Sequence, residues 1–258
     1  MGLGAGMDLG VIGRVGMKGF GYTVIGISLT LLVGTLIGKL LKTGKDCSLL
    51  ITAGTAICGG SAIAALAPTI RAKPHDVSVA LGTVFILNAL ALFLFPWVGH
   101  ALSLSQAQFG LWSALAIHDT SSVVGATLQY GAQAVEIGTT IKLARALWIV
   151  PLTFAVGFIY AKKNAESQTE KPKRPWFILG FLAMAALVTW VPTLASTGRI
   201  IEFLARRTLV LTLFFIGANL TRSTLKAVGF KPFVQGVSLW FAVASVSLAA
   251  ILANLIQV

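Results

Sequence analysis

The pair His118-Asp119 interrupts a stretch that is otherwise apolar and long enough to enter a bilayer, so it is the first candidate for chemistry. Ionisable side chains at membrane depth are costly and are usually functional. A histidine beside a carboxylate can relay a proton, because burial and neighbouring charges tune both groups. The hydroxyls of Thr120, Ser121 and Ser122 follow directly and offer bonds to a ligand. The alternative is a structural role, in which Asp119 and Ser121 cap the following helix and His118 bonds to backbone.

A second interrupted stretch, residues 54–62, is rich in glycine between two apolar runs. Glycine lets the backbone unwind and approach a ligand or another helix closely. A helix that starts near Gly60 would direct its N-terminal amides and positive dipole end at the membrane centre, where they can bind an anion. Small residues also suit close packing of helices, which is the alternative. The site residues predicted in this stretch are Thr55, Gly59, Gly60 and Ser61.

Lys142 and Arg145 are three residues apart in a later apolar segment, so they share one face of a helix. They could face an anionic substrate, or they could neutralise Asp119 or Glu136. Alternatively, their long side chains extend to the nearby membrane interface and keep their charges in water. The predicted binding site therefore combines two interrupted segments with two cations.

The composition indicates a membrane protein with several spans. The chain has 258 residues, of which 56% are hydrophobic and 11% charged, and its mean hydropathy is +0.88. An average soluble domain has about 25% charged residues. The N-terminus is rich in glycine, contains Asp8 and lacks the pattern of a cleavable signal. Two cysteines, Cys47 and Cys58, do not make a disulfide framework.

The formal net charge of +12 does not indicate a nucleic-acid-binding protein. The basic residues lie mostly in short loops between apolar runs, as in inner-membrane proteins that meet anionic lipid headgroups. No DNA- or RNA-binding motif accompanies them. We therefore expect a multi-pass protein of the inner membrane whose partners are lipids and a small anion, not nucleic acid. The sequence leaves a homo-oligomer open.

We predict an all-α polytopic bundle that forms one transmembrane domain over residues 1–258, with a polar loop at 162–175. The first predicted segment is short and contains Asp8, so the chain resembles one that lacks N-terminal helices. Two segments are interrupted, which is the best sequence indication of a transporter's binding site. The nine predicted segments cover about residues 1–13, 20–40, 47–70, 77–100, 107–130, 137–161, 176–193, 206–221 and 232–257.

A weak internal repeat relates residues 4–24 to residues 217–237 at a constant offset. Each copy contains Gly-Ala, a short basic loop and a long apolar run. If all nine segments cross the membrane, the two copies run in opposite directions, as in the inverted repeats of secondary transporters. Chance matching in a biased composition is the alternative.

Enzyme signatures do not stand out in the sequence. The stretch around Ser61 lacks the flanking glycine of a nucleophile elbow, and no phosphate-binding loop is present. The three histidines are scattered and do not have the spacing of a zinc site. We therefore expect no catalytic activity, no bound cofactor and no metal, apart from a coupling proton or sodium ion.

The sequence resembles the YeiH-like sulfate exporter family over nearly its whole length. The resemblance rests on residues 54–65 followed by Pro68, on 109–112 and 117–120, on 135–145, and on 176–181. It implies a bacterial inner-membrane carrier with inverted repeats and crossed discontinuous helices, and sulfate or a sulfonate as substrate. Members of the family are longer at the N-terminus by two or three helices.

Together these features predict a secondary active transporter for a small anion that works by alternating access. His118 and Asp119 would couple protons, and Lys142 and Arg145 would supply positive charge. One alternative is a sodium-coupled carrier for an organic solute, in which Asp119 and unwound carbonyls hold Na⁺. Another is a truncated membrane protein that does not transport.

Overall fold

The computed structural model describes residues 9–163, residues 183–211 apart from 185, 195, 199, 202, 205, 206, 209 and 210, and residues 229–256. This part of the chain is helical and contains no strand, which confirms the predicted all-α class. A short 3₁₀ helix, η2, covers Pro192–Leu194. The α-helices are α1 Leu9–Leu40, α2 Lys45–Ala56, α3 Gly60–Ile70, α4 Pro74–Ala101, α5 Gln106–Ala116, α6 Thr120–Leu128, α7 Ala132–Ala146, α8 Ile149–Lys163 and α12 Phe230–Leu252.

Four helical stretches among the described residues are long and apolar enough to cross a membrane: Gly21–Leu40, Pro74–Ala101, Ala132–Tyr160 and Phe230–Leu252. Large apolar side chains on these stretches point outward. Leu36 is 55% exposed, Phe93 77%, Phe158 75% and Phe241 71%. Exposed aromatic and aliphatic side chains on long apolar helices suit a hydrocarbon surrounding. The helices confirm the prediction of a membrane protein.

The first described helix differs from the expected segments. α1 runs from Leu9 to Leu40 without a break, whereas the sequence suggests separate segments at 1–13 and 20–40. The residues between them include two glycines and two basic residues but no proline. Glycine costs a helix only about 1 kcal/mol and keeps its N–H, so the hydrogen-bond ladder continues.

The predicted segment 137–161 is divided into α7 and α8 by a turn at residues 147–148. Pro151 lies in the first turn of α8 and has no N–H to donate to the carbonyl of Leu147. That carbonyl instead accepts from the amide of Val150 at 3.2 Å. The helix is therefore interrupted just before Pro151, because the proline cannot donate the hydrogen bond that would continue α7 into α8.

Several predicted features fall outside the described residues. These are residues 164–175 of the polar loop, most of the segment at 206–221, and the second copy of the repeat up to residue 228. The predicted segment at 176–193 is described only from residue 183 onwards.

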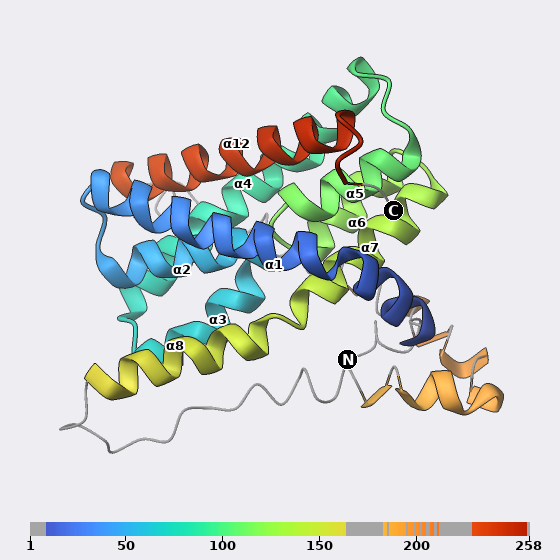
Figure 1. Cartoon of the computed structure of the whole chain (residues 1–258), viewed down its shortest axis with the longest axis horizontal. Coiled ribbons are helices and arrows are strands. Elements are labelled where there is room, and N and C mark those ends of the chain that lie inside the picture. Colours follow the sequence, from blue (N-terminus) through green and yellow to red (C-terminus); the bar gives the residue numbers. More distant parts are fainter. Residues whose placement is uncertain are drawn as a thin grey trace.

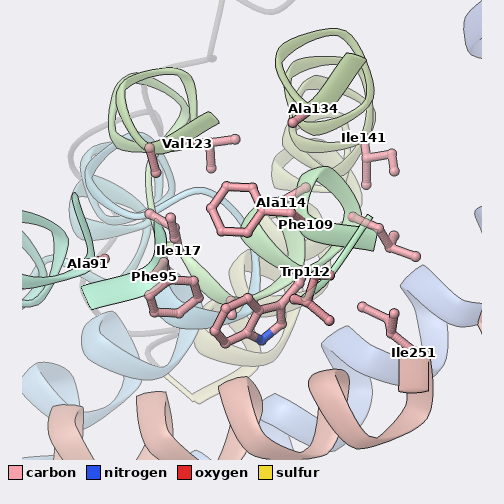
Figure 2. Close-up of a cluster of buried hydrophobic side chains, with 14 of the residues drawn as sticks. Ala91, Phe95, Phe109, Trp112, Ala114, Ile117, Val123, Ala134, Ile141 and Ile251 are labelled. Atoms are coloured by element: carbon pink, nitrogen blue, oxygen red, sulfur yellow. The ribbon is translucent and has the colours of Figure 1, made fainter. Parts of the chain in front are cut away.

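The helices pack as a bundle in which segments distant in sequence lie together (Figure 1). α12 lies beside α4 along one edge of the bundle, and α8 lies beside α3 along another. Aromatic rings join α12 to α4 and α5. Phe95 stacks on Trp112 with 4.2 Å between centroids, and the Trp112 Nε1–H donates to the carbonyl of Ala244 at 3.0 Å. Figure 2 shows Phe95, Phe109 and Trp112 at the centre of this cluster.

A buried glutamine ties α12 to α1 and α2. Gln235 is fully buried, and its Nε2 donates to the hydroxyl of Ser48 at 2.8 Å and to the carbonyl of Gly34 at 3.1 Å. A Cβ on Gly38 would lie 1.9 Å from the Ser48 hydroxyl oxygen, so this close approach requires glycine. Small residues and a polar bond thus hold α1 and α12 against α2, whose C-terminal end reaches the candidate site.

Candidate functional site

Two short non-helical segments meet inside the bundle. The chain leaves helix between the end of α2 at Ala56 and the start of α3 at Gly60, and again between the end of α5 at Ala116 and the start of α6 at Thr120. A Cβ on Gly59 would lie 3.2 Å from the backbone carbonyl carbon of His118. Residues 57–59 and 117–119 are called the junction below. The C-termini of α2 and α5 and the N-termini of α3 and α6 therefore lie around one small region.

His118 is fully buried and joins the two halves of the junction. Its Nε2 lies 3.1 Å from the hydroxyl oxygen of Thr55, and that hydroxyl is also 3.0 Å from the carbonyl of Ile51. A carbonyl can only accept, so the single Thr55 hydrogen points to Ile51 and His118 Nε2 carries the other hydrogen. The remaining ring nitrogen, Nδ1, is buried and has no hydrogen-bond partner among the described atoms.

Asp119 caps the start of α6. Its Oδ1 accepts from the Ser122 amide at 2.7 Å and from the Ser121 hydroxyl at 2.8 Å, and its Oδ2 accepts from the Ser122 hydroxyl at 3.0 Å. A carboxylate at this position satisfies free amides and interacts favourably with the helix dipole. The N-terminus of α6 is therefore already occupied by a negative charge from the chain itself.

Asn88 of α4 belongs to the same group, although the sequence suggests only a helix-packing role for it. Its Nδ2 donates to Asp119 Oδ2, and its Oδ1 accepts from the His118 amide at 3.1 Å. The only sequence signal is an amide inside a long apolar helix, which suits ordinary interhelical contact equally well. Asn88 positions both ionisable residues of the junction at once.

Replacing Asn88 with Ala is expected to lower the free energy of unfolding by about 1–3 kcal/mol, because it leaves a buried backbone amide and a carboxylate oxygen each short of one partner. The thermal midpoint of the purified protein in detergent measures the change. Leu90→Ala on the same helix is the control, since Leu90 is 51% exposed. An equal or smaller loss in Asn88→Ala than in Leu90→Ala would contradict the positioning role.

Lys142 and Arg145 of α7 are both buried and both donate to carbonyls at helix ends. Lys142 Nζ is 2.6 Å from the carbonyl of Ile117 and 3.3 Å from that of Ala114. The terminal nitrogens of Arg145 donate to Ala114 at 3.1 Å, to Leu115 at 2.7 Å, and to the carbonyl of Ala56 at the end of α2. Because helix C-termini carry free carbonyls and partial negative charge, cations stabilise both ends.

Some donors at the junction remain without an acceptor. The Arg145 Nε–H is buried and has no hydrogen-bond partner among the described atoms. Gly59, which precedes α3, has no side chain to cap that helix, and no described acceptor faces the amides of Gly60 and Ser61. An ammonium has three N–H groups, whereas Lys142 has two acceptors within the described residues. N–H groups without an acceptor in the described part of the chain favour the binding of a ligand that supplies acceptor atoms.

The charges at the junction do not balance when Lys142 carries a proton. When Lys142 is protonated, Lys142 and Arg145 contribute two positive charges, and Asp119 contributes one negative charge. With His118 neutral, the excess is one positive charge in a region where Lys142 is fully buried and Arg145 is 3% exposed. An unpaired buried charge is costly, so an anion would stabilise this arrangement.

The predicted site residues divide into two groups. Thr55, Gly59, His118, Asp119, Ser121, Ser122, Lys142 and Arg145 lie at the junction or bond to it. Three others contribute no side chain to the junction. The Ser61 side chain is exposed, Gly60 faces Phe85 of α4, and Thr120 is half-buried. Glu136 is exposed. The carbonyls at the end of α5, which a sodium site would require, already accept from Lys142 and Arg145.

Comparisons with known proteins agree with a membrane protein. A UPF0324 membrane protein of Bdellovibrio bacteriovorus is 68% identical over 98% of this chain and 78% of its own length. UPF0324 membrane proteins of Geobacter sulfurreducens and Bacteroides thetaiotaomicron are 53% and 52% identical, each over 97% of this chain and over 79% and 75% of their own lengths. No solved structure matches. A family model described as conserved hypothetical protein 698 matches residues 1–236, and the chain belongs to this family of UPF0324 membrane proteins, consistent with the YeiH-like resemblance.

Proposed function

We propose that this protein is a secondary active transporter that moves a small anion across the inner membrane by alternating access. Two observations carry the proposal: the junction has an excess of buried positive charge when Lys142 is protonated, and the buried Nε–H of Arg145 has no partner among the described atoms. A buried charge and a buried N–H without a partner are costly in free energy unless a ligand supplies the opposite charge and the hydrogen-bond acceptor. An oxyanion such as sulfate or a sulfonate has several acceptor oxygens and negative charge, so it complements both features.

The anion would bind at the open end of α3. There it would meet the amides of Gly60 and Ser61, the Nε–H of Arg145 and the ammonium of Lys142. The N-terminus of α6 is not available in the same way, because Asp119 already caps it. The sequence predicts a binding site that combines both interrupted segments, whereas in this proposal only the N-terminus of α3 binds the anion.

In this proposal α2–α3 and α5–α6 are two discontinuous membrane segments. Irregular backbone at membrane depth is tolerated where protein covers it or where it lines a water-filled cavity. Buried side chains from α4 and α7 satisfy many of the groups that the interruptions leave free. Alternating access would expose the junction to one side of the membrane and then to the other. An inverted repeat would supply the pseudo-symmetry for that motion.

The test is uptake of radiolabelled sulfate and methanesulfonate by proteoliposomes under an imposed pH gradient, with sodium or with choline as the bulk cation. We expect flux that depends on the pH gradient and does not change when choline replaces sodium. Flux only with sodium would favour the sodium-coupled alternative. No flux of either anion from protein with an intact thermal transition would contradict anion transport.

A matched pair of variants separates the junction from the general effect of positive charge. Lys142→Met removes the buried cation and is expected to reduce sulfate flux at least about tenfold, because the excess charge that favours the anion is lost. Lys39→Met removes an exposed cation from the last turn of α1 and is expected to leave flux unchanged. Equal flux in Lys142→Met and wild type would place the binding site elsewhere.

A further inference from the structure

The side chain of Lys142 has features of a group that exchanges a proton during turnover. Its Nζ is fully buried and donates to two carbonyls, those of Ala114 and Ile117. A neutral amine has two N–H groups and an ammonium has three. The chain therefore supplies an acceptor for each N–H of the neutral form and leaves one N–H of the charged form for a ligand.

The balance of charges around Lys142 also indicates that Lys142 is the group that exchanges a proton. Arg145, on the same helix, does not lose its proton in proteins. From the junction, His118, Asp119 and Cys58 lie close enough to Lys142 to interact with it electrostatically. On α1, which also contacts α7, the titratable side chains within residues 21–40 are Tyr22 and Lys39, and both are exposed. With Lys142 neutral, Arg145 and Asp119 balance each other, and with Lys142 charged one positive charge is in excess.

The other titratable groups at the junction are less suited to carry a proton in this way. All four hydrogen bonds to Asp119 come from donors, namely the Asn88 amide, the Ser121 hydroxyl, and the Ser122 amide and hydroxyl. A proton on Asp119 would have to displace one of them. A proton on His118 Nδ1 would add a third positive charge beside Lys142 and Arg145.

We propose that Lys142, and not His118 or Asp119, carries the coupling proton. This inference rests on the proposed anion transport and specifies how it is driven. When the anion binds, the Lys142 amine takes a proton from water and its third N–H bonds to the anion. When the anion leaves, the ammonium returns that proton to water on the same side, and the two remaining N–H groups stay on the carbonyls of Ala114 and Ile117. The anion and one proton therefore cross together.

The proposal is tested by counting protons taken up when sulfate or methanesulfonate binds to the purified full chain. Calorimetric titrations in buffers of different ionisation enthalpy give this number, and neither probe titrates between about pH 6 and pH 9. We expect uptake of about one proton for each anion bound. In the pH range where Lys142 is neutral in the empty protein, the affinity for the anion should fall about tenfold for each unit by which the pH rises, because binding and protonation are linked. Lys142→Arg keeps the charge permanently, so it is expected to bind the anion with no proton uptake and no pH dependence over this range.

The outcomes separate this inference from the proposed function. No binding of either anion by folded wild-type protein would overturn both. Binding by the wild type without proton uptake would overturn the role of Lys142 and leave anion transport standing. His118→Asn is expected to keep the proton count near one, and loss of the count in that variant would overturn the assignment even if Lys142→Arg fails to fold. Lys39→Gln is the matched control for loss of a lysine charge and is expected to keep the count.

Discussion

Replacing Arg145 with Ala is expected to produce the largest loss of stability of any single substitution at the junction. Arg145 donates to the carbonyls of Ala56, Ala114 and Leu115, which lie at the ends of two different helices. Removing it leaves the carbonyls of Ala56 and Leu115 without this donor in a region that water reaches poorly. At about 1–3 kcal/mol for each of these two unmet groups, the loss should be about 2–6 kcal/mol. The thermal midpoint and the yield of folded protein in mild detergent measure this change.

Two further variants show which property of Arg145 is responsible. Arg145→Lys keeps the charge, but an ammonium cannot present the planar fork that reaches both helix ends, so we expect only partial rescue. Lys39→Ala removes an exposed cation in the last turn of α1 and should change stability by less than about 0.5 kcal/mol. Full rescue by Arg145→Lys would mean that the charge alone matters and that the bond to Ala56 is dispensable.

Gly59→Ala is expected to have the next largest effect, because it disturbs the contact between the two halves of the junction. Gly59 has φ 62° and ψ −125°, a conformation that L-residues with a Cβ rarely adopt. The new Cβ would also lie 3.2 Å from both the carbonyl carbon and the Cβ of His118. Strain of this kind costs about 1–3 kcal/mol. We expect a lower thermal midpoint together with weaker anion binding, since the shift separates α3 from His118.

Gly44→Ala provides the matched control for Gly59→Ala. Gly44 precedes α2 and has φ −53° and ψ 136°, and a Cβ at this position would meet no atom of a non-adjacent residue within 4 Å. An alanine there should change stability by less than about 0.5 kcal/mol and leave anion binding intact. If the two variants melt at the same temperature, the contact between Gly59 and His118 does not hold the junction together.

Local patterns in the sequence were sufficient for some of these features. Apolar runs of sufficient length identify membrane helices, because hydrocarbon selects for composition and length. A glycine pair at 59–60 and the polar run that starts at His118 mark the places where the chain leaves helix. The position of Asp119 before a hydroxyl-rich helix start indicates its capping role, since an N-cap acts on residues two or three positions away.

The partners of Lys142, Arg145 and Asn88 depend on tertiary structure. Spacing predicts that Lys142 and Arg145 share a helix face, but it does not tell whether that face meets an anion, a carboxylate or the membrane interface. In the structure, Arg145 reaches Ala56, 89 residues earlier in the chain, and Asn88 reaches Asp119, 31 residues later. Which free carbonyl lies opposite which donor depends on how the helices pack.

Composition and motifs are enough to identify an α-helical membrane protein of the UPF0324 family and the two places where polar residues interrupt apolar segments. The direction of both cations of α7 toward helix C-termini, and the link that Asn88 makes between His118 and Asp119, depend on how the helices pack. This difference follows from the range of the interactions. Composition, periodicity and capping act within a few residues, whereas a buried charge is stabilised by whatever groups the fold brings within about 3 Å of it.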